Sequence, residues 1–154
     1  MDPALEDELA RLAREVARKA WSPYSGFRVG AALLAADGRR WAGCNVENAS
    51  YGLTVCAERS AVFQAVAAGA HLDGAGGRRE QPFEALVLWA SSDRPTPPCG
   101  ACRQVLAEFA ACPEDLEVVM VGEGGDRERA TLAELLPRAF GCGGVGLSGG
   151  QDST

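Results

Sequence analysis

The sequence predicts an α/β fold, a single domain in which helices pack on the faces of a central sheet. The chain has 154 residues, the size of one ordinary domain, and its 47% hydrophobic and 23% charged residues are typical of a globular protein. Helical and strand-like patterns alternate along it, and such alternation places helices against a sheet. The alternation alone leaves the order and direction of the strands open.

The first half of the chain predicts a helix, a hairpin and a second helix. Residues 2–20 form an amphipathic helix, because apolar residues recur at spacings of three and four: Leu5, Leu9, Leu12 and Val16. After the loop SPYSGF, the strands RVGAALLAA and RRWAGCNVE flank Asp37-Gly38, which is a hairpin signal. The second helix runs over residues 56–68 and ends at Gly69.

The second half continues the alternation. FEALVLWAS predicts a buried strand, and the prolines of SDRPTPP interrupt regular structure before a helix over residues 99–112. LEVVMVG is another strand, and TLAELLPRAF opens with Thr131 and Glu134 at the spacing of a capping box. We expect residues 1–140 to form the domain and the Gly-rich residues 141–154 to form a flexible tail.

Charge and composition exclude several classes of partner. The net charge is −6 and the basic residues form no cluster, so a nucleic-acid polymer is not expected. No apolar run reaches the roughly 18 residues of a membrane span, and the acidic start lacks the order of a signal peptide. We therefore expect a cytoplasmic protein with a small-molecule ligand. In that compartment six cysteines favour metal ligands, catalytic groups or buried thiols over disulfides.

Three of the cysteines have the spacing of a metal site. Cys56 begins one predicted helix, and Cys99 and Cys102 lie one turn apart at the start of another. A helix N-terminus favours thiolate, the form that binds metal. Three protein ligands with one open position are typical of catalytic zinc, and Glu58 lies where its carboxylate can accept a proton from a zinc-bound water.

The charge of such a site suggests a role for Arg59. Three thiolates and one Zn²⁺ sum to −1, so a guanidinium that donates hydrogen bonds to the sulfurs would restore the acidity of the metal. The alternative is an ordinary surface arginine. Arg103 is open to the same two interpretations.

The motifs CAE, PCGACRQ, SPYSGFRVGAAL, GCNVENASYG and LLPRAF together resemble the cytidine deaminase family, the small zinc-dependent nucleoside deaminases with three cysteine ligands. The resemblance extends from about Trp21 to Phe140. It implies a three-layer domain with a mixed five-stranded sheet between helices, one zinc per chain, and hydrolysis of cytidine and 2'-deoxycytidine in pyrimidine salvage. Pro97 stands where many relatives have a small polar residue.

The resemblance also implies roles for individual residues. Cys56, Cys99 and Cys102 match the zinc ligands, and Glu58 matches the proton shuttle. Phe27 matches an aromatic residue that packs on the pyrimidine. Asn45 and Glu47 match the pair that binds the ribose hydroxyls, and Ala57 matches a residue whose backbone amide holds the base. Tyr51 and Phe140 match residues that reach a neighbouring subunit's site, because the family is typically homotetrameric.

Three other functions remain open at this point. A deaminase of a cytosine-containing antibiotic of the blasticidin type shares the cysteine layout, although the NVENASYG segment favours a ribose. A non-catalytic, zinc-stabilised binding module would require four protein ligands, and three are evident. A polynucleotide deaminase would require a basic groove, which the charge of −6 disfavours.

Overall fold

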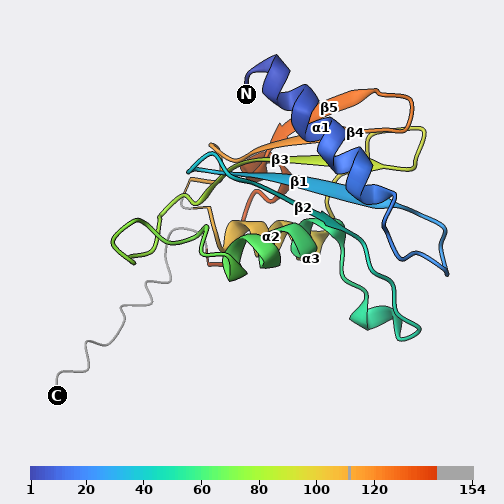
Figure 1. The fold of residues 1–154 in the computed structure, drawn as a ribbon, viewed down its shortest axis with the longest axis horizontal. Coiled ribbons are helices and arrows are strands. Elements are labelled where there is room, and N and C mark those ends of the chain that lie inside the picture. Colours follow the sequence, from blue (N-terminus) through green and yellow to red (C-terminus); the bar gives the residue numbers. More distant parts are fainter. Residues whose placement is uncertain (111, 142–154) are drawn as a thin grey trace.

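A mixed sheet lies at the centre of the protein (Figure 1). The structure, a computed structural model, describes residues 1–110 and 112–141. The elements of this part are, in chain order, α1 (Pro3–Ala17), β1 (Val29–Ala35), β2 (Arg40–Cys44), the short 3-10 helix η1 (Tyr51–Leu53), α2 (Ala57–Ala67), β3 (Phe83–Ala90), α3 (Gly100–Ala107), β4 (Glu117–Val121), β5 (Arg127–Thr131) and α4 (Leu132–Leu135).

The five strands that the described residues form are ordered β2-β1-β3-β4-β5. Strand β1 pairs antiparallel with both β2 and β3. Strand β3 runs parallel to β4, and β5 returns antiparallel along β4. The sheet is therefore mixed, which confirms the fold class expected from the family resemblance.

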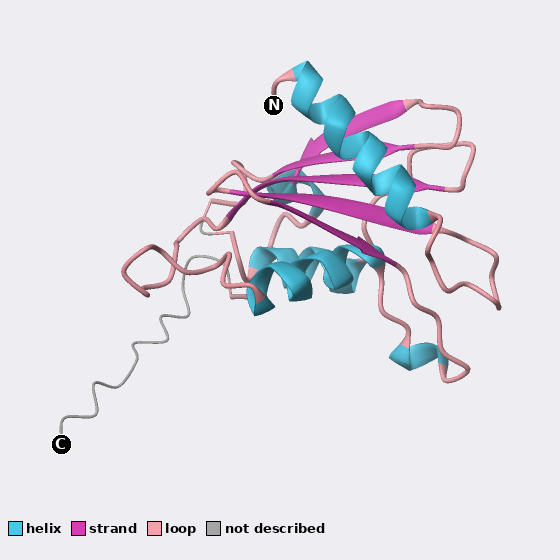
Figure 2. Cartoon of the chain, viewed as in Figure 1, coloured by secondary structure: helices cyan, strands magenta, loops and turns pink. Residues whose placement is uncertain are grey.

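Different helices cover the two faces of the sheet and give three layers (Figures 1 and 2). Alternate residues of β1 show the division, because Ala32 and Leu34 belong to the apolar cluster with α1, whereas Ala31 and Leu33 belong to the cluster with α2 and α3. This is the two-residue period of a strand buried on both faces. As a result α2 and α3 lie on the same side of the sheet.

The predicted helices and the hairpin are present, with shifted ends. Residues 2–20 contain α1, whose first turn is capped by the Asp2 side chain on the Leu5 N–H. The turn between β1 and β2 contains Gly38 at φ 81°, a left-handed conformation that glycine adopts without strain. Helix α3 is shorter than the expected 99–112, since it ends at Ala107. The capping box of Thr131 and Glu134 is confirmed, although α4 is only four residues long.

The individual sequence patterns did not indicate β5. Its residues, RERAT, are mostly charged and exposed, as suits the outer edge of a sheet. The strand is fastened to α1 through the buried carboxylate of Glu6, which accepts hydrogen bonds from Arg127 at 2.7 Å and from Arg129 at 2.8 and 3.0 Å. Tertiary pairing, rather than local apolar pattern, forms this strand.

Two further expectations concern the ends and surroundings of the chain. Residues 142–154 of the expected tail, Cys142 among them, lie outside the described residues, so the boundary at 140 stays a prediction. Within the described part, no helix combines the length and the apolar character needed to cross a bilayer.

Candidate active site

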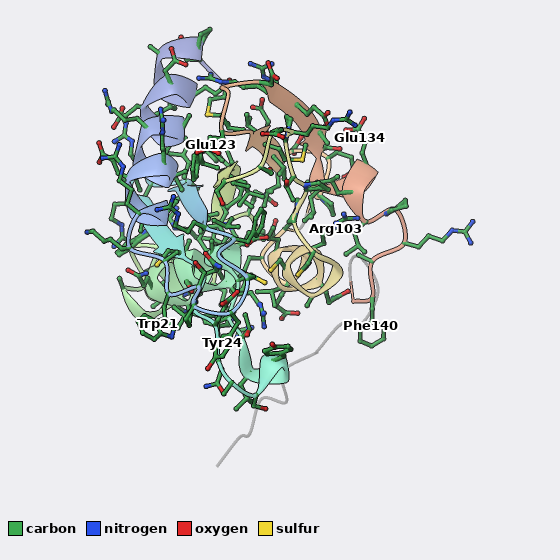
Figure 3. All side chains as sticks on the ribbon, turned by 90° about the vertical axis from the view of Figure 1, so that its right-hand side faces the viewer. Trp21, Tyr24, Arg103, Glu123, Glu134 and Phe140 are labelled. Atoms are coloured by element: carbon green, nitrogen blue, oxygen red, sulfur yellow. The ribbon has the colours of Figure 1, made fainter. Side chains whose placement is uncertain are left out.

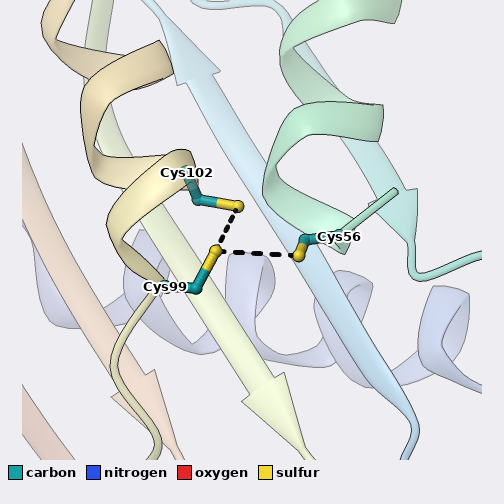
Figure 4. A group of neighbouring side chains, drawn as sticks. All are labelled: Cys56, Cys99 and Cys102. Atoms are coloured by element: carbon teal, nitrogen blue, oxygen red, sulfur yellow. Dashed lines mark hydrogen bonds between the residues drawn. The ribbon is translucent and has the colours of Figure 1, made fainter. Parts of the chain in front are cut away.

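The three predicted metal ligands lie at the N-terminal ends of α2 and α3. Cys56 is the N-cap residue of α2, and Cys99 is the N-cap residue of α3. Cys102 is buried in the first turn of α3. Because both helices pack on one face of the sheet and begin at the same end of it, the three sulfurs converge, as Figure 4 shows.

The distances between the sulfurs fit a zinc ion. The Sγ atom of Cys99 lies 3.8 Å from that of Cys56 and 3.4 Å from that of Cys102, and all three lie within 4.8 Å of one another. A tetrahedral zinc with bonds of about 2.3 Å separates two sulfur ligands by about 3.8 Å. Within the described chain the candidate metal-binding group consists of these three residues, so a tetrahedral ion held by them would keep one position open.

The surroundings of Cys56 favour its thiolate. Hydrogen bonding from Cys102 lowers the pKa of Cys56 to about 5, with smaller contributions from Arg59 and Cys99 against the opposing effect of burial. The pKa of Cys102 is raised, first because of its hydrogen bond with Cys56 and then because of burial. The two thiols thus share protons unequally, and of these two Cys56 more readily presents a negative sulfur.

Arg59 contacts the cluster, as the charge argument requires. Its Nη2 lies 3.5 Å from the Sγ of Cys56 and also donates to the Thr54 carbonyl at 3.0 Å. Arg103 has a different role, because its Nε donates to the Pro98 carbonyl at 2.6 Å and its Nη1 to the Leu135 carbonyl at 2.8 Å. It joins the segment before α3 to the end of α4, and its side-chain hydrogen bonds within the described residues do not include the three sulfurs.

Glu58 is buried in the wall of the site. It follows Cys56 by two residues in the first turn of α2, and only 4% of its surface is exposed. Burial raises the pKa of this carboxyl, and the negative charge of Cys56 adds to the increase. A carboxyl that protonates more easily is suited both to accept and to release a proton near neutral pH.

A cavity of about 270 Å³ opens beside the sulfurs. Cys56, Glu58 and Cys99 lie in its wall. The remaining lining is largely apolar or uncharged. It comes from the loop before β1, from β1 and β3, from the segment between β2 and α2, from the first residue of α2 and from the segment before α3: Ser25, Phe27, Val29, Asn45, Glu47, Thr54, Ala57, Leu88, Ala90, Thr96 and Pro97. An apolar pocket with a few convergent polar groups is typical of a small-molecule site.

Four of the residues expected to bind substrate lie in this wall. They are Phe27, Asn45, Glu47 and Ala57. Ala57 is the first residue of α2, where a backbone N–H has no acceptor within the helix. Their common location brings together residues that are up to 30 positions apart in sequence, and their contacts with a substrate stay a prediction.

Tyr51 and Phe140 do not line this cavity. Tyr51 is 73% exposed and its ring makes an edge-to-face contact with Tyr24, with ring centroids 5.8 Å apart. Phe140 is 82% exposed and projects outward from the chain (Figure 3). Two large exposed rings contribute nothing to this chain's own core, so a role at a neighbouring subunit's site stays a prediction.

The sequence analysis did not single out several residues of the wall. Ser25, Thr54 and Thr96 supply hydroxyl groups beside the expected ligands. Ser25 and Thr54 lie within the segments SPYSGF and ENASYGLTV, which were interpreted as loop and connection. The sequence did offer one indication that Ser25 belongs to the site. Ser25 is a polar residue two positions before Phe27, the aromatic residue expected to contact the substrate.

Comparison with known proteins gives a consistent result. The family model of the cytidine and deoxycytidylate deaminase zinc-binding region matches residues 4–115. A cytidine deaminase of Sporosarcina psychrophila is 44% identical over 134 residues, which cover 87% of this chain and 90% of that protein. A cytidine deaminase of Halalkalibacterium halodurans is 50% identical over 121 residues, which cover 79% and 83%.

Solved structures agree in fold. The crystal structure of a cytidine deaminase from Burkholderia pseudomallei has a TM-score of 0.78 at 44% identity, and the match covers 91% of this chain and all of that one (100%). A cytidine deaminase from Mycobacterium tuberculosis has a TM-score of 0.69 at 39% identity, with 88% and 96% covered.

Proposed function

Since this chain belongs to the cytidine and deoxycytidylate deaminase family, we propose that it hydrolyses cytidine and 2'-deoxycytidine to uridine and 2'-deoxyuridine with release of ammonia. The observation that carries the proposal is the location of three convergent thiols and one buried carboxyl in the wall of a single, largely apolar cavity. The role that we propose for the reaction is pyrimidine salvage in the cytoplasm.

Cys56, Cys99 and Cys102 would hold the zinc, and Glu58 would move the protons. When bound, zinc acts as a Lewis acid that brings the pKa of a coordinated water toward neutrality. Glu58 accepts the proton of the attacking water and delivers it to N3 of the cytosine ring. It then takes the second proton of that water from the hydroxyl group on C4 and passes it to the amino group. The C4–N bond breaks as the C4 carbonyl forms, so one water is consumed and one ammonia is released.

Phe27, Ala57, Asn45 and Glu47 would orient the nucleoside. The Phe27 ring offers an apolar face to the pyrimidine, and the first free amide of α2 at Ala57 is a hydrogen-bond donor to it. Asn45 and Glu47 supply polar groups for the ribose hydroxyls. None of the described residues in the cavity wall is Lys or Arg, so a nucleoside suits the cavity better than a nucleotide.

Tyr51 and Phe140 support a further proposal, that the active assembly is a homotetramer in which neighbours complete each site. Both rings are largely exposed in the isolated chain, at 73% and 82%. Exposed aromatic rings are characteristic of protein interfaces. Light scattering of the active enzyme tests the assembly, and an active monomer would contradict it.

The activity is tested by following the ultraviolet absorbance of cytidine with the purified, zinc-loaded protein. Loss of absorbance with release of ammonia is expected, and both should stop after treatment with a chelator and return with added zinc. Blasticidin-type substrates and single-stranded DNA serve as comparison substrates. An inert cytidine solution with fully zinc-loaded protein would refute the proposal and favour a non-catalytic zinc module.

A further inference from the structure

We propose that Ser25 is a positioning residue, which fixes the Glu47 carboxylate and the Phe27 backbone relative to each other and so sets the affinity for the nucleoside. The inference rests on the proposed function. It concerns a loop residue whose hydroxyl group joins the two ends of the substrate cavity, the ribose end at Glu47 and the base end at Phe27.

The contacts of Ser25 carry the inference. Its Oγ–H donates to Glu47 Oε1, and the same Oγ accepts the Phe27 N–H at 3.0 Å. The backbone N–H groups of Tyr24 and Ser25 donate to Glu47 Oε2 at 2.9 and 3.3 Å. One short loop therefore holds both oxygens of the carboxylate, and the hydroxyl of Ser25 is the atom that links this carboxylate to the chain at Phe27.

Phe27 is held from its other side as well. Its carbonyl accepts the Asn45 Nδ2–H at 2.9 Å, and Asn45 Oδ1 accepts the Val29 N–H at 2.8 Å. Gly26, at φ 68°, makes the tight turn that brings Ser25 Oγ back to the Phe27 amide. The Phe27 backbone is thus clamped at its N–H by Ser25 and at its carbonyl by Asn45.

The acceptor capacity of Glu47 shows why this geometry bears on affinity. An ionised carboxylate accepts about four hydrogen bonds, and the loop occupies three of them. The hydrogen bond from Ser25 is the largest cause that lowers the pKa of Glu47, which keeps it an acceptor only. The remaining acceptor position is suited to a ribose hydroxyl, and its direction is fixed as long as Ser25 holds Oε1.

Removal of the hydroxyl should weaken binding and spare the chemistry. In Ser25→Ala, KM for cytidine should rise roughly tenfold to hundredfold, because the contacts it orients are made equally in the ground state and the transition state. The kcat value should stay within about threefold of the parent, since Glu58 and the thiols are not touched. Ser25→Thr keeps the Oγ atom and should restore KM to within about threefold.

A double-mutant cycle separates positioning from general damage to the loop. Ser25→Ala should raise KM less in a Glu47→Gln background than in the parent, because only its contact with Phe27 is then lost from an intact pair. The two effects on KM should therefore fall clearly short of additivity. Ser22→Ala is the matched control, because this serine lies in the same loop and its side chain makes no hydrogen bond within the described chain. It should leave KM unchanged.

The outcomes distinguish this inference from the proposed function. A parent protein that fails to deaminate cytidine refutes the function itself. An active parent whose Ser25→Ala variant keeps its KM, or whose cycle with Glu47→Gln is additive, refutes the positioning role alone. A fall in kcat with unchanged KM would also contradict it, because the hydroxyl would then act on the reaction and not on binding.

Discussion

The substitution Gly43→Ala tests how closely the site depends on the packing of α2 against the sheet. A Cβ at Gly43 in β2 would lie 2.4 Å from the Ala61 N and 2.6 Å from the Ala57 O. Ordinary contact begins near 3.4 Å, so the backbone of α2 must move by about 1 Å. Overpacking of this kind costs about 1–3 kcal/mol of stability.

The same movement should reach the chemistry, because α2 carries Glu58 and its N-cap is Cys56, a proposed zinc ligand. A displacement of about 1 Å at a catalytic group lowers the rate roughly 10²-fold. We therefore expect Gly43→Ala to lose about two orders of magnitude in kcat/KM and to melt several degrees lower, while zinc is still bound. The three measurements are steady-state kinetics on cytidine, thermal denaturation and zinc content per chain.

Gly124→Ala is the control for this experiment, because a Cβ there meets nothing within 4 Å. It should match the parent in both rate and melting temperature. A Gly43→Ala variant with parental kcat/KM would show that α2 tolerates the shift without loss of alignment, and would refute the reasoning from packing to catalysis.

Three other variants test the metal, the proton shuttle and the edge strand. Cys102→Ala should lose most of its zinc by elemental analysis, and full occupancy would refute the three-thiolate site. Glu58→Gln should retain zinc but lose a factor at or above the top of the roughly 10²–10⁴ range of general acid–base catalysis, and activity within tenfold of the parent would exclude the role. Burial tends to raise the pKa of Glu6, but hydrogen bonds from Arg129 and Arg127 outweigh it and lower the pKa. The ionised Glu6 therefore stabilises the folded protein fully above about pH 4.5, the ordinary pKa of the group, and this contribution is lost as the pH falls through the lowered pKa. Glu6→Gln should therefore melt below the parent at pH 7 and converge with it in acid; a constant difference in melting temperature would contradict the linkage.

Much of the fold can be predicted from local sequence patterns, and where the prediction fails the failure has a physical cause. The apolar runs that became β1, β3 and β4 are buried in the sheet at nearly every position, and burial on both faces selects apolar residues there. Strand β5 is different, because its charged side chains face solvent and α1, and its pairing is decided by β4. No pattern within RERAT itself indicates a strand.

The residues of the site also fall into two groups, those that local spacing predicts and those that depend on tertiary packing. Cys99 and Cys102 could be paired from sequence because one helical turn separates them, and both are found at one end of α3. Cys56 comes from another helix, and its approach to Cys99 depends on how α2 and α3 pack on the sheet. Phe27 and Asn45 were indicated by family resemblance alone, since the hydrogen bond between them spans 18 residues of sequence.

The fold itself would offset the charge of the proposed metal site. Three thiolates and one Zn²⁺ leave −1, and the sulfurs of Cys56 and Cys99 lie at the positive ends of two helices. Arg59 adds a full positive charge, but its Nη2 is shared between Cys56 and the Thr54 carbonyl, and its Nε has no hydrogen-bond partner within the described chain. Because Thr54 precedes α2 and Arg59 lies in its first turn, the bond between them holds the guanidinium at a fixed distance from the sulfur. The single segment 54–59 thus carries the residues proposed as a ligand, as the proton acceptor and as the counter-charge, so a change in the start of α2 should alter all three together.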